Sequence, residues 1–160
     1  MIRFVTCLLM CGLGGYAGMR AGQAPAATTE EPLRLGNFSV SLAVKDLKVS
    51  QAFYEKLGFH AAFGQAEQNW LILQNDGATI GLFQGMLPKN TLTFNPGWDR
   101  SAKTLAEFDD VRDIQQRLLD QGIELSLKTD AAGAGVASIM LSDPDGNPIL
   151  VDQHVPKPKK

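Results

Sequence analysis

The chain has 160 residues, of which 44% are hydrophobic and 20% charged, and its formal net charge is -2 at pH 7. This composition supports one compact domain with a sizeable core and excludes disordered and collagen-like proteins. Apart from Lys157, Lys159 and Lys160 in a proline-spaced tail at 155–160, basic residues are not clustered, so electrostatics give no case for nucleic-acid binding.

The first 26 residues differ in composition from the rest of the chain. Arg3 is followed by the apolar run FVTCLLMCGLGGYAGM and then by small residues that end in A-x-A at 24–26. This order is typical of a secretory signal peptide, cleaved after Ala17 or Ala26, and the run is too short and glycine-rich for a transmembrane helix. We therefore expect an exported protein, periplasmic or extracellular; a frayed N-terminal extension is the alternative.

Cys7 and Cys11 are the two cysteines of the chain, and both lie in this first segment. The letters LLMCG around Cys11 resemble a lipoprotein acylation site, although Met10 is bulkier than the residue usually found there. A lipoprotein is therefore the alternative to simple export, and we expect no membrane contact for the mature domain unless Cys11 is acylated. Without these cysteines the mature chain would suit an oxidising compartment.

Beyond a linker at 27–35, the chain contains a repeat that is defined by spacing. Asp46 and Gly58 are twelve residues apart, as are Asp110 and Gly122, and one offset of 64 aligns the two pairs. In each copy an alternating strand, FSVSLAV or KTLAEF, precedes an aspartate suited to cap a helix, and a glycine suited to the helix C-terminus follows. Each copy therefore predicts a strand followed by a helix.

Short strand-like segments follow both helices. They are FHAAF, NWLILQ and ATIGLF in the first copy and IELSLK, GVASIML and NPILVDQ in the second, and DPDG at 143–146 indicates a hairpin turn. The sequence thus predicts an α+β fold of two βαβββ modules, at about 36–84 and 101–154. Neither module has enough elements for a core of its own, so the two should pair.

This pattern resembles the vicinal oxygen chelate superfamily, which includes glyoxalase I, bleomycin-resistance proteins and extradiol dioxygenases. The resemblance covers about residues 36–154 and rests on the paired βαβββ spacing and on the letters SDPDGNPILV. It implies a curved mixed sheet whose concave side is a ligand cup. In metal-dependent members it also implies one histidine or carboxylate ligand on the first and fourth strand of each module.

The residues at these four positions are not metal ligands. By the resemblance and the offset of 64, they are Ser39, Gly81, Lys103 and Leu150. A divalent metal in such a cup ordinarily needs at least three imidazole or carboxylate donors. The two histidines, His60 and His154, fall on different strand ends, where surface or hairpin roles are expected. We therefore expect neither a metal nor another cofactor.

Strand alternation gives the cup a mixed lining of apolar, hydroxyl and ionisable side chains. Lys103 either pairs with Asp152 or Glu107 or recognises an anionic or carbonyl-containing ligand. Trp98, in the loop between the modules, either closes the mouth of the cup or packs at a subunit interface. The predicted ligand-binding residues are Ser39, Ser41, Phe83, Trp98, Lys103, Leu105, Leu150 and Asp152.

Because similar cups serve isomerisation, ring cleavage and sequestration, the fold does not fix the function. Our first hypothesis is a metal-free binding protein, expected to be a homodimer, that holds a small, partly aromatic or amphipathic molecule. The alternative is a lyase- or isomerase-like enzyme in which Lys103, Glu107 or Asp152 is the acid–base group. A third hypothesis, a structural dimer module, predicts a filled cup.

Overall fold

The structure, a computed structural model, describes residues 31–158 and leaves Lys159, Lys160 and the first 30 residues outside. The signal peptide interpretation of residues 1–26, with Cys7 and Cys11, and the first part of the linker therefore lie outside the described residues. No helix in the described part of the chain is both long and apolar enough to cross a bilayer.

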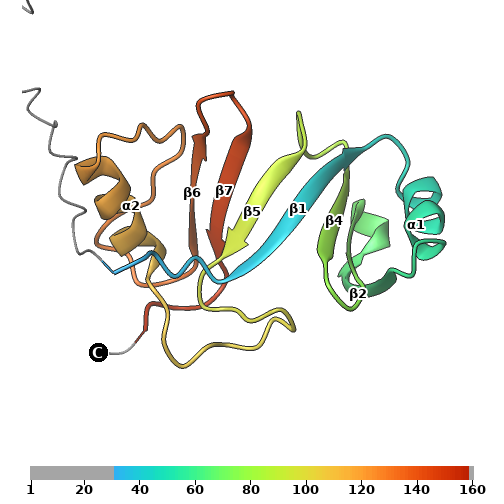
Figure 1. Cartoon of the computed structure of the whole chain (residues 1–160), viewed down its shortest axis with the longest axis horizontal. Coiled ribbons are helices and arrows are strands. Elements are labelled where there is room, and N and C mark those ends of the chain that lie inside the picture. Colours follow the sequence, from blue (N-terminus) through green and yellow to red (C-terminus); the bar gives the residue numbers. More distant parts are fainter. Residues whose placement is uncertain (1–30, 159–160) are drawn as a thin grey trace, which may run out of the picture. The chain divides into compact units, whose positions relative to one another are not determined.

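Within residues 31–158 the chain forms seven strands, two α-helices and one short 3₁₀-helix (Figure 1). In chain order these are β1 (Asn37–Val44), α1 (Leu47–Glu55), β2 (His60–Gln65), the 3₁₀-helix η1 (Ala66–Gln68), β3 (Trp70–Gln74), β4 (Thr79–Gln84), β5 (Thr91–Asn95), α2 (Val111–Asp120), β6 (Ala137–Ser142) and β7 (Pro148–Gln153).

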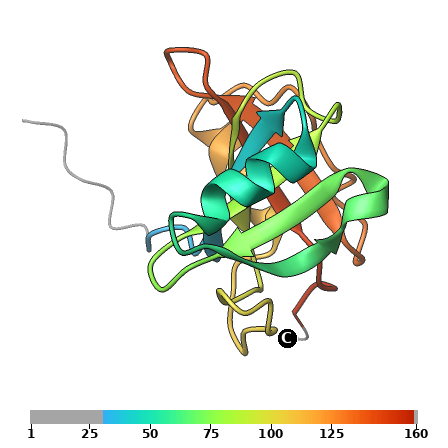
Figure 2. The ribbon, with the colours of Figure 1, turned by 90° about the vertical axis from the view of Figure 1, so that its right-hand side faces the viewer.

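The strands form one mixed, unclosed sheet in the order β2-β3-β4-β1-β5-β7-β6. At its centre β1 pairs antiparallel with β5, and each of these strands has a parallel neighbour, β4 for β1 and β7 for β5. Figures 1 and 2 show the resulting curvature, with α1 beside β4 and α2 beside β6. The predicted α+β fold with a curved mixed sheet is confirmed.

Two separate apolar clusters hold the helices on the sheet. Under α1, Leu47 packs with Leu73 and Leu82, and Leu42 and Val44 of β1 join this cluster. Since side chains alternate along a strand, Ser39 and Ser41 of β1 face the opposite side of the sheet. The second cluster lies under α2 and contains Val111, Ile114, Leu118, Ile139, Leu141 and Val151. Both helices thus cover one face and leave the other free.

The second module begins at β5, and the prediction that its first strand is KTLAEF is wrong. β5 pairs with β7 through Thr93 and Leu150, as β1 pairs with β4 through Ser41 and Gly81. Residues 103–108 form no strand of the sheet; only Thr104 bridges to Trp98, its near neighbour in the chain. The offset of 64 fails here because residues 96–110 lie between β5 and α2, whereas only residues 45 and 46 separate β1 from α1.

The segment IELSLK, which was expected to be a strand, also forms no strand of the sheet. It contributes only one isolated bridge, between Leu127 and Met140. The second module therefore has one strand fewer in the sheet than the first.

The predicted helix caps are confirmed, but their surroundings differ. Asp46 caps α1 by accepting a hydrogen bond from the Val49 amide at 3.0 Å and is exposed to solvent. Asp110 caps α2 by accepting from the Arg112 amide at 3.0 Å, and its side chain is fully buried.

A buried polar network surrounds Asp110. Gln153 Nε2 donates to its carboxylate at 2.9 Å, and the guanidinium of Arg112 lies 3.2 Å away. The same guanidinium donates to the carbonyl oxygens of Asp130 and Gly135 at 3.2 and 2.9 Å. Burial acts to raise the pKa of Asp110, but the hydrogen bonds from Gln153 and Arg112 outweigh it, so that this pKa lies below its ordinary value.

Replacing the two caps should therefore have unequal effects. Asp110→Ala leaves the buried Arg112 without its counter-charge and should lower the free energy of unfolding by about 3–5 kcal/mol. Asp46→Ala removes an exposed cap and should cost about 1 kcal/mol. Urea denaturation of the two full-length variants measures the difference, and equal losses would show that the network around Asp110 does not stabilise the fold.

Candidate functional site

The free face of the sheet encloses an open cavity of about 620 Å³ between the two modules. It is lined by residues of β1, β3, β4, β5 and β7, by Phe63 of β2 and by the segments that follow β4, β5 and β7. We call this cavity the cup. Its size is within the range of small-molecule sites, which combine a mostly apolar surface with a few polar groups. The filled cup of the structural-module hypothesis is not observed in the described residues.

The two sides of the cup differ in chemistry. The apolar wall comes from β2, β3, β4 and the segment after β4, and consists of Phe63, Trp70, Ile72, Phe83, Met86 and Leu87. The hydroxyl floor comes from the two central strands and consists of Ser39, Ser41, Thr91 and Thr93, all buried by the protein around them. A ligand in the cup would therefore meet carbon on one side and hydroxyl groups on the other.

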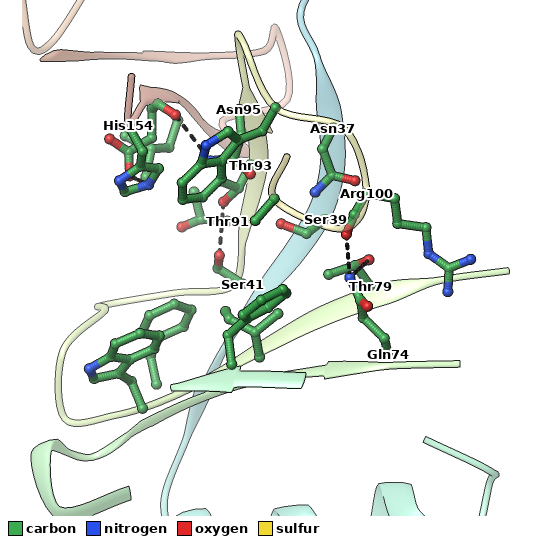
Figure 3. Close-up of a pocket in the computed structure, with 18 of the residues that line it drawn as sticks. Asn37, Ser39, Ser41, Gln74, Thr79, Thr91, Thr93, Asn95, Arg100 and His154 are labelled. Atoms are coloured by element: carbon green, nitrogen blue, oxygen red, sulfur yellow. Dashed lines mark hydrogen bonds and ion pairs between the residues drawn. The ribbon is translucent and has the colours of Figure 1, made fainter. Parts of the chain in front are cut away.

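The pairing of β1 with β5 sets the geometry of the hydroxyl floor. Ser41 lies opposite Thr91 and Ser39 opposite Thr93, and the hydroxyl oxygens of Ser41 and Thr93 are 2.8 Å apart (Figure 3). Either of these two groups can be the donor. Thr91 donates to the Lys89 carbonyl oxygen at 3.2 Å, while the Ser39 hydroxyl has no hydrogen-bond partner within residues 31–158.

One end of the cup is closed by residues 96–105, which we call the arm. The arm folds back on itself, with the Leu105 amide donating to the Gly97 carbonyl oxygen at 2.8 Å and the Trp98 carbonyl oxygen accepting from the Asn37 amide at 3.0 Å. Gly97 has a φ of +83°, and a Cβ there would lie 2.4 Å from Val155 Cγ2, so this sharp fold requires glycine.

The tip of the arm is fastened to the turn between β3 and β4. The Arg100 carbonyl oxygen accepts from Gln74 Nε2 at 2.6 Å, and the guanidinium donates to the carbonyl oxygens of Asp76 and Ala78. In Figure 3 this side chain extends away from Ser41 and Thr93. A segment of the second module thus reaches across the cup to the first module.

Three side chains meet where β7 ends at the cup. The carboxylate of Asp152 lies 3.0 Å from His154 Nε2, and the imidazole stacks on the indole of Trp98 with ring centroids 4.4 Å apart and planes 14° apart. The hydrogen bond to Asp152 raises the pKa of His154, partial burial opposes this rise, and the negative charge of Asp152 adds to it. His154 is therefore a titratable group at this end of the cup.

Most of the predicted ligand-binding residues line the cup, but two do not. Lys103 and Leu105 lie on the returning half of the arm, because KTLAEF is not a strand. Whether the others contact a ligand stays a prediction; those that line the cup are Ser39, Ser41, Phe83, Trp98, Leu150 and Asp152.

Several lining residues were missed from the sequence. Thr91, Thr93 and Asn95 alternate in TLTFN, the pattern of a half-buried strand, and this pattern could have identified β5. Trp70 was not predicted to line the cup, and His154 was given a surface or hairpin role. Their places depend on contacts between distant parts of the chain, which local spacing does not predict.

The donor set does not fit a divalent metal. The pairs Ser41–Gly81 and Thr93–Leu150 make Thr91, and not Lys103, the equivalent of Ser39 in the second module. At Gly81 a Cβ would lie 2.4 Å from the ring of Phe83, so this ring covers the position. Two hydroxyls, a glycine and a leucine offer no imidazole or carboxylate. Among the described residues, no group of three or more His, Cys, Asp or Glu could hold a metal ion.

The model of the glyoxalase/bleomycin resistance protein/dioxygenase superfamily matches residues 36–151. A structure of a member of this superfamily from Vibrio splendidus 12B01 is 20% identical, with a TM-score of 0.52 over 73% of this chain and 97% of that one. No curated protein matches the sequence.

Two further structures show the same fold. An NAD-dependent benzaldehyde dehydrogenase structure from Legionella pneumophila is 18% identical, with a TM-score of 0.55 over 74% of this chain and 99% of that one. An extradiol ring-cleaving dioxygenase from Brevibacterium fuscum is 20% identical, with a TM-score of 0.51 over 83% of this chain and 36% of that one. At such identities these similarities concern the fold alone.

The contact with Asp152 should change the pH at which His154 titrates. The raised pKa means that this contact stabilises the fold below the ordinary imidazole pKa and that the stabilisation is lost as the pH rises through the raised value. In an NMR titration of a His60→Gln variant, His154 should titrate at a higher pH in the folded chain than in the urea-unfolded chain. Asp152→Asn should lower the folded value, and an unchanged pKa would contradict the assigned pairing.

Proposed function

The chain belongs to the glyoxalase/bleomycin resistance protein/dioxygenase superfamily, and we propose that it binds a small, partly aromatic or amphipathic molecule in the cup without a metal ion. The observation that carries the proposal is an open cavity of about 620 Å³ in which hydroxyl, glycine and leucine residues stand where metal ligands would be needed. Binding would then depend on the apolar wall and the hydroxyl floor.

The apolar wall supplies the main driving force in this proposal. Burying the apolar surface of a ligand contributes roughly 25 cal/mol for each Å² removed from water. Trp70 and Phe83 are aromatic and lie opposite each other in the register of β3 and β4, so both can contact a flat ring. The hydroxyl floor would orient the ligand, because its groups donate and accept hydrogen bonds.

Acid–base catalysis is the second candidate function. The observation that favours it is the Asp152–His154 pair at the cup, since a carboxylate that orients an imidazole is a common arrangement for proton transfer. Lys103, proposed from the sequence for this role, does not line the cup. Asp152, which contacts His154, was also proposed from the sequence as an acid–base group, and it lines the cup.

Blocking the cup should abolish binding, and the arm offers a matched control. Leu150→Trp places a large side chain in the cup, whereas Leu105→Trp adds the same side chain at a position that does not line it. At a 2-naphthol concentration of about 100 Kd, the full chain should gain roughly 2.7 kcal/mol of stability by mass action. Thermal unfolding should show this gain for the Leu105 variant and not for the Leu150 variant.

The same experiment tests whether ligand binding requires a metal ion. Both tryptophans of the chain, Trp70 and Trp98, line the cup, so ligand binding should also change the intrinsic fluorescence. Prior treatment with a chelator should alter neither signal. A response that disappears with chelator, or that survives in the Leu150 variant, would contradict binding in a metal-free cup.

A further inference from the structure

The charged groups around the cup are already engaged or face away from it, whereas its floor carries only hydroxyls. We infer that the cup selects an uncharged aromatic molecule with a hydrogen-bonding group on one edge, such as an aromatic alcohol, ketone or amide, and discriminates against carboxylates and ammonium ions. This inference, which rests on the proposed binding function, replaces one of the two roles expected for Lys103, the recognition of an anionic or carbonyl-containing ligand.

The two acidic residues that line the cup have partners. Asp152 contacts His154 at 3.0 Å, so a cationic ligand would have to compete with the imidazole for this carboxylate. Asp99 accepts hydrogen bonds from the amides of Ser101 and Lys103 at 2.8 and 2.9 Å, which hold the fold of the arm. Neither carboxylate belongs to the hydroxyl floor, so a ligand ammonium group seated on the floor would have hydroxyls and not a counter-charge as its neighbours.

The cations give no better site for an anion. Lys103 does not line the cup, and the positive charge of protonated His154 is balanced by Asp152. Arg100 lines the cup, but its terminal nitrogens donate to the carbonyl oxygens of Asp76 and Ala78. Its Nε is buried and has no hydrogen-bond partner among the described residues, so a ligand cannot reach it without movement of the arm.

The hydroxyl floor is suited to a neutral polar group. Ser41 and Thr93 can exchange the roles of donor and acceptor, and Ser39 adds a hydroxyl that has no partner in the described residues. A ligand hydroxyl or carbonyl can therefore be satisfied whichever way its own hydrogen bonds point. A charged group on the same floor would lose its hydration without gaining a counter-charge, which is strongly unfavourable.

Four ligands that share one ring system separate the effect of ligand charge from the effect of a hydrogen-bonding group. They are 2-naphthol, 2-naphthoate, 2-naphthylmethylammonium and 2-methylnaphthalene, titrated calorimetrically into the full chain at pH 7. The naphthol should bind at least roughly tenfold more tightly than either ion, because neither charge is compensated. It should bind about threefold to tenfold more tightly than 2-methylnaphthalene, the gain expected of one net hydrogen bond.

Removal of one floor hydroxyl should reduce this last advantage. Thr93→Val keeps the shape of the side chain but deletes its oxygen and the contact with Ser41, so the preference for 2-naphthol over 2-methylnaphthalene should decrease. Ser142→Ala deletes a hydroxyl outside the cup and serves as the control, in which the preference should persist.

The outcomes distinguish the inference from the proposed function. If 2-naphthoate or the ammonium ion binds as tightly as 2-naphthol, the cup is not selective for neutral molecules, although it still binds ligands. If 2-methylnaphthalene equals 2-naphthol in the native chain, the hydroxyl floor does not contribute and the inference is also overturned. If none of the four binds to folded protein, the proposed function fails together with the inference.

Discussion

The antiparallel pairing of β1 with β5 positions the two modules and the cup between them. It joins the two modules into one sheet and leaves each strand a parallel partner, β4 or β7, on its other side. Because these two strands are central, their cup-facing residues form the floor, and the pairing places the hydroxyls of Ser41 and Thr93 2.8 Å apart. Both the position of the cup and its uncharged floor follow from this one pairing.

Local features of the sequence predicted a large part of this fold. The spacing of Asp46 with Gly58 and of Asp110 with Gly122 located both helices, because a cap and a C-terminal glycine act within a few residues. The hairpin around DPDG was predicted for the same reason, since the Asp143 side chain accepts from the amides of Asp145 and Asn147 at 3.0 and 2.8 Å. Where the controlling contacts are local, the sequence interpretation was correct.

The first strand of the second module could not be placed in this way. TLTFN and KTLAEF both alternate, and what separates them is that β5 has strand partners on both sides whereas residues 103–108 fold back within the arm. Those partners are distant in the sequence, so the period of the letters cannot choose between the two segments. The error placed Lys103 in the predicted cup as its cation and left Thr91 and Thr93 out. The ligand was therefore expected to have a different chemistry.

A crystal structure with bound 2-naphthol separates metal-free binding in the cup from the alternatives. If the cup binds without a metal, a crystal of the full chain grown with 2-naphthol, with anomalous scattering recorded for transition metals, will show the ring against Trp70 and Phe83. The ligand hydroxyl will be hydrogen-bonded to the floor near Ser41 and Thr93, with no metal between them. Anomalous density for a metal ion in the cup, or a ligand bound at another surface with the cup empty, would contradict it.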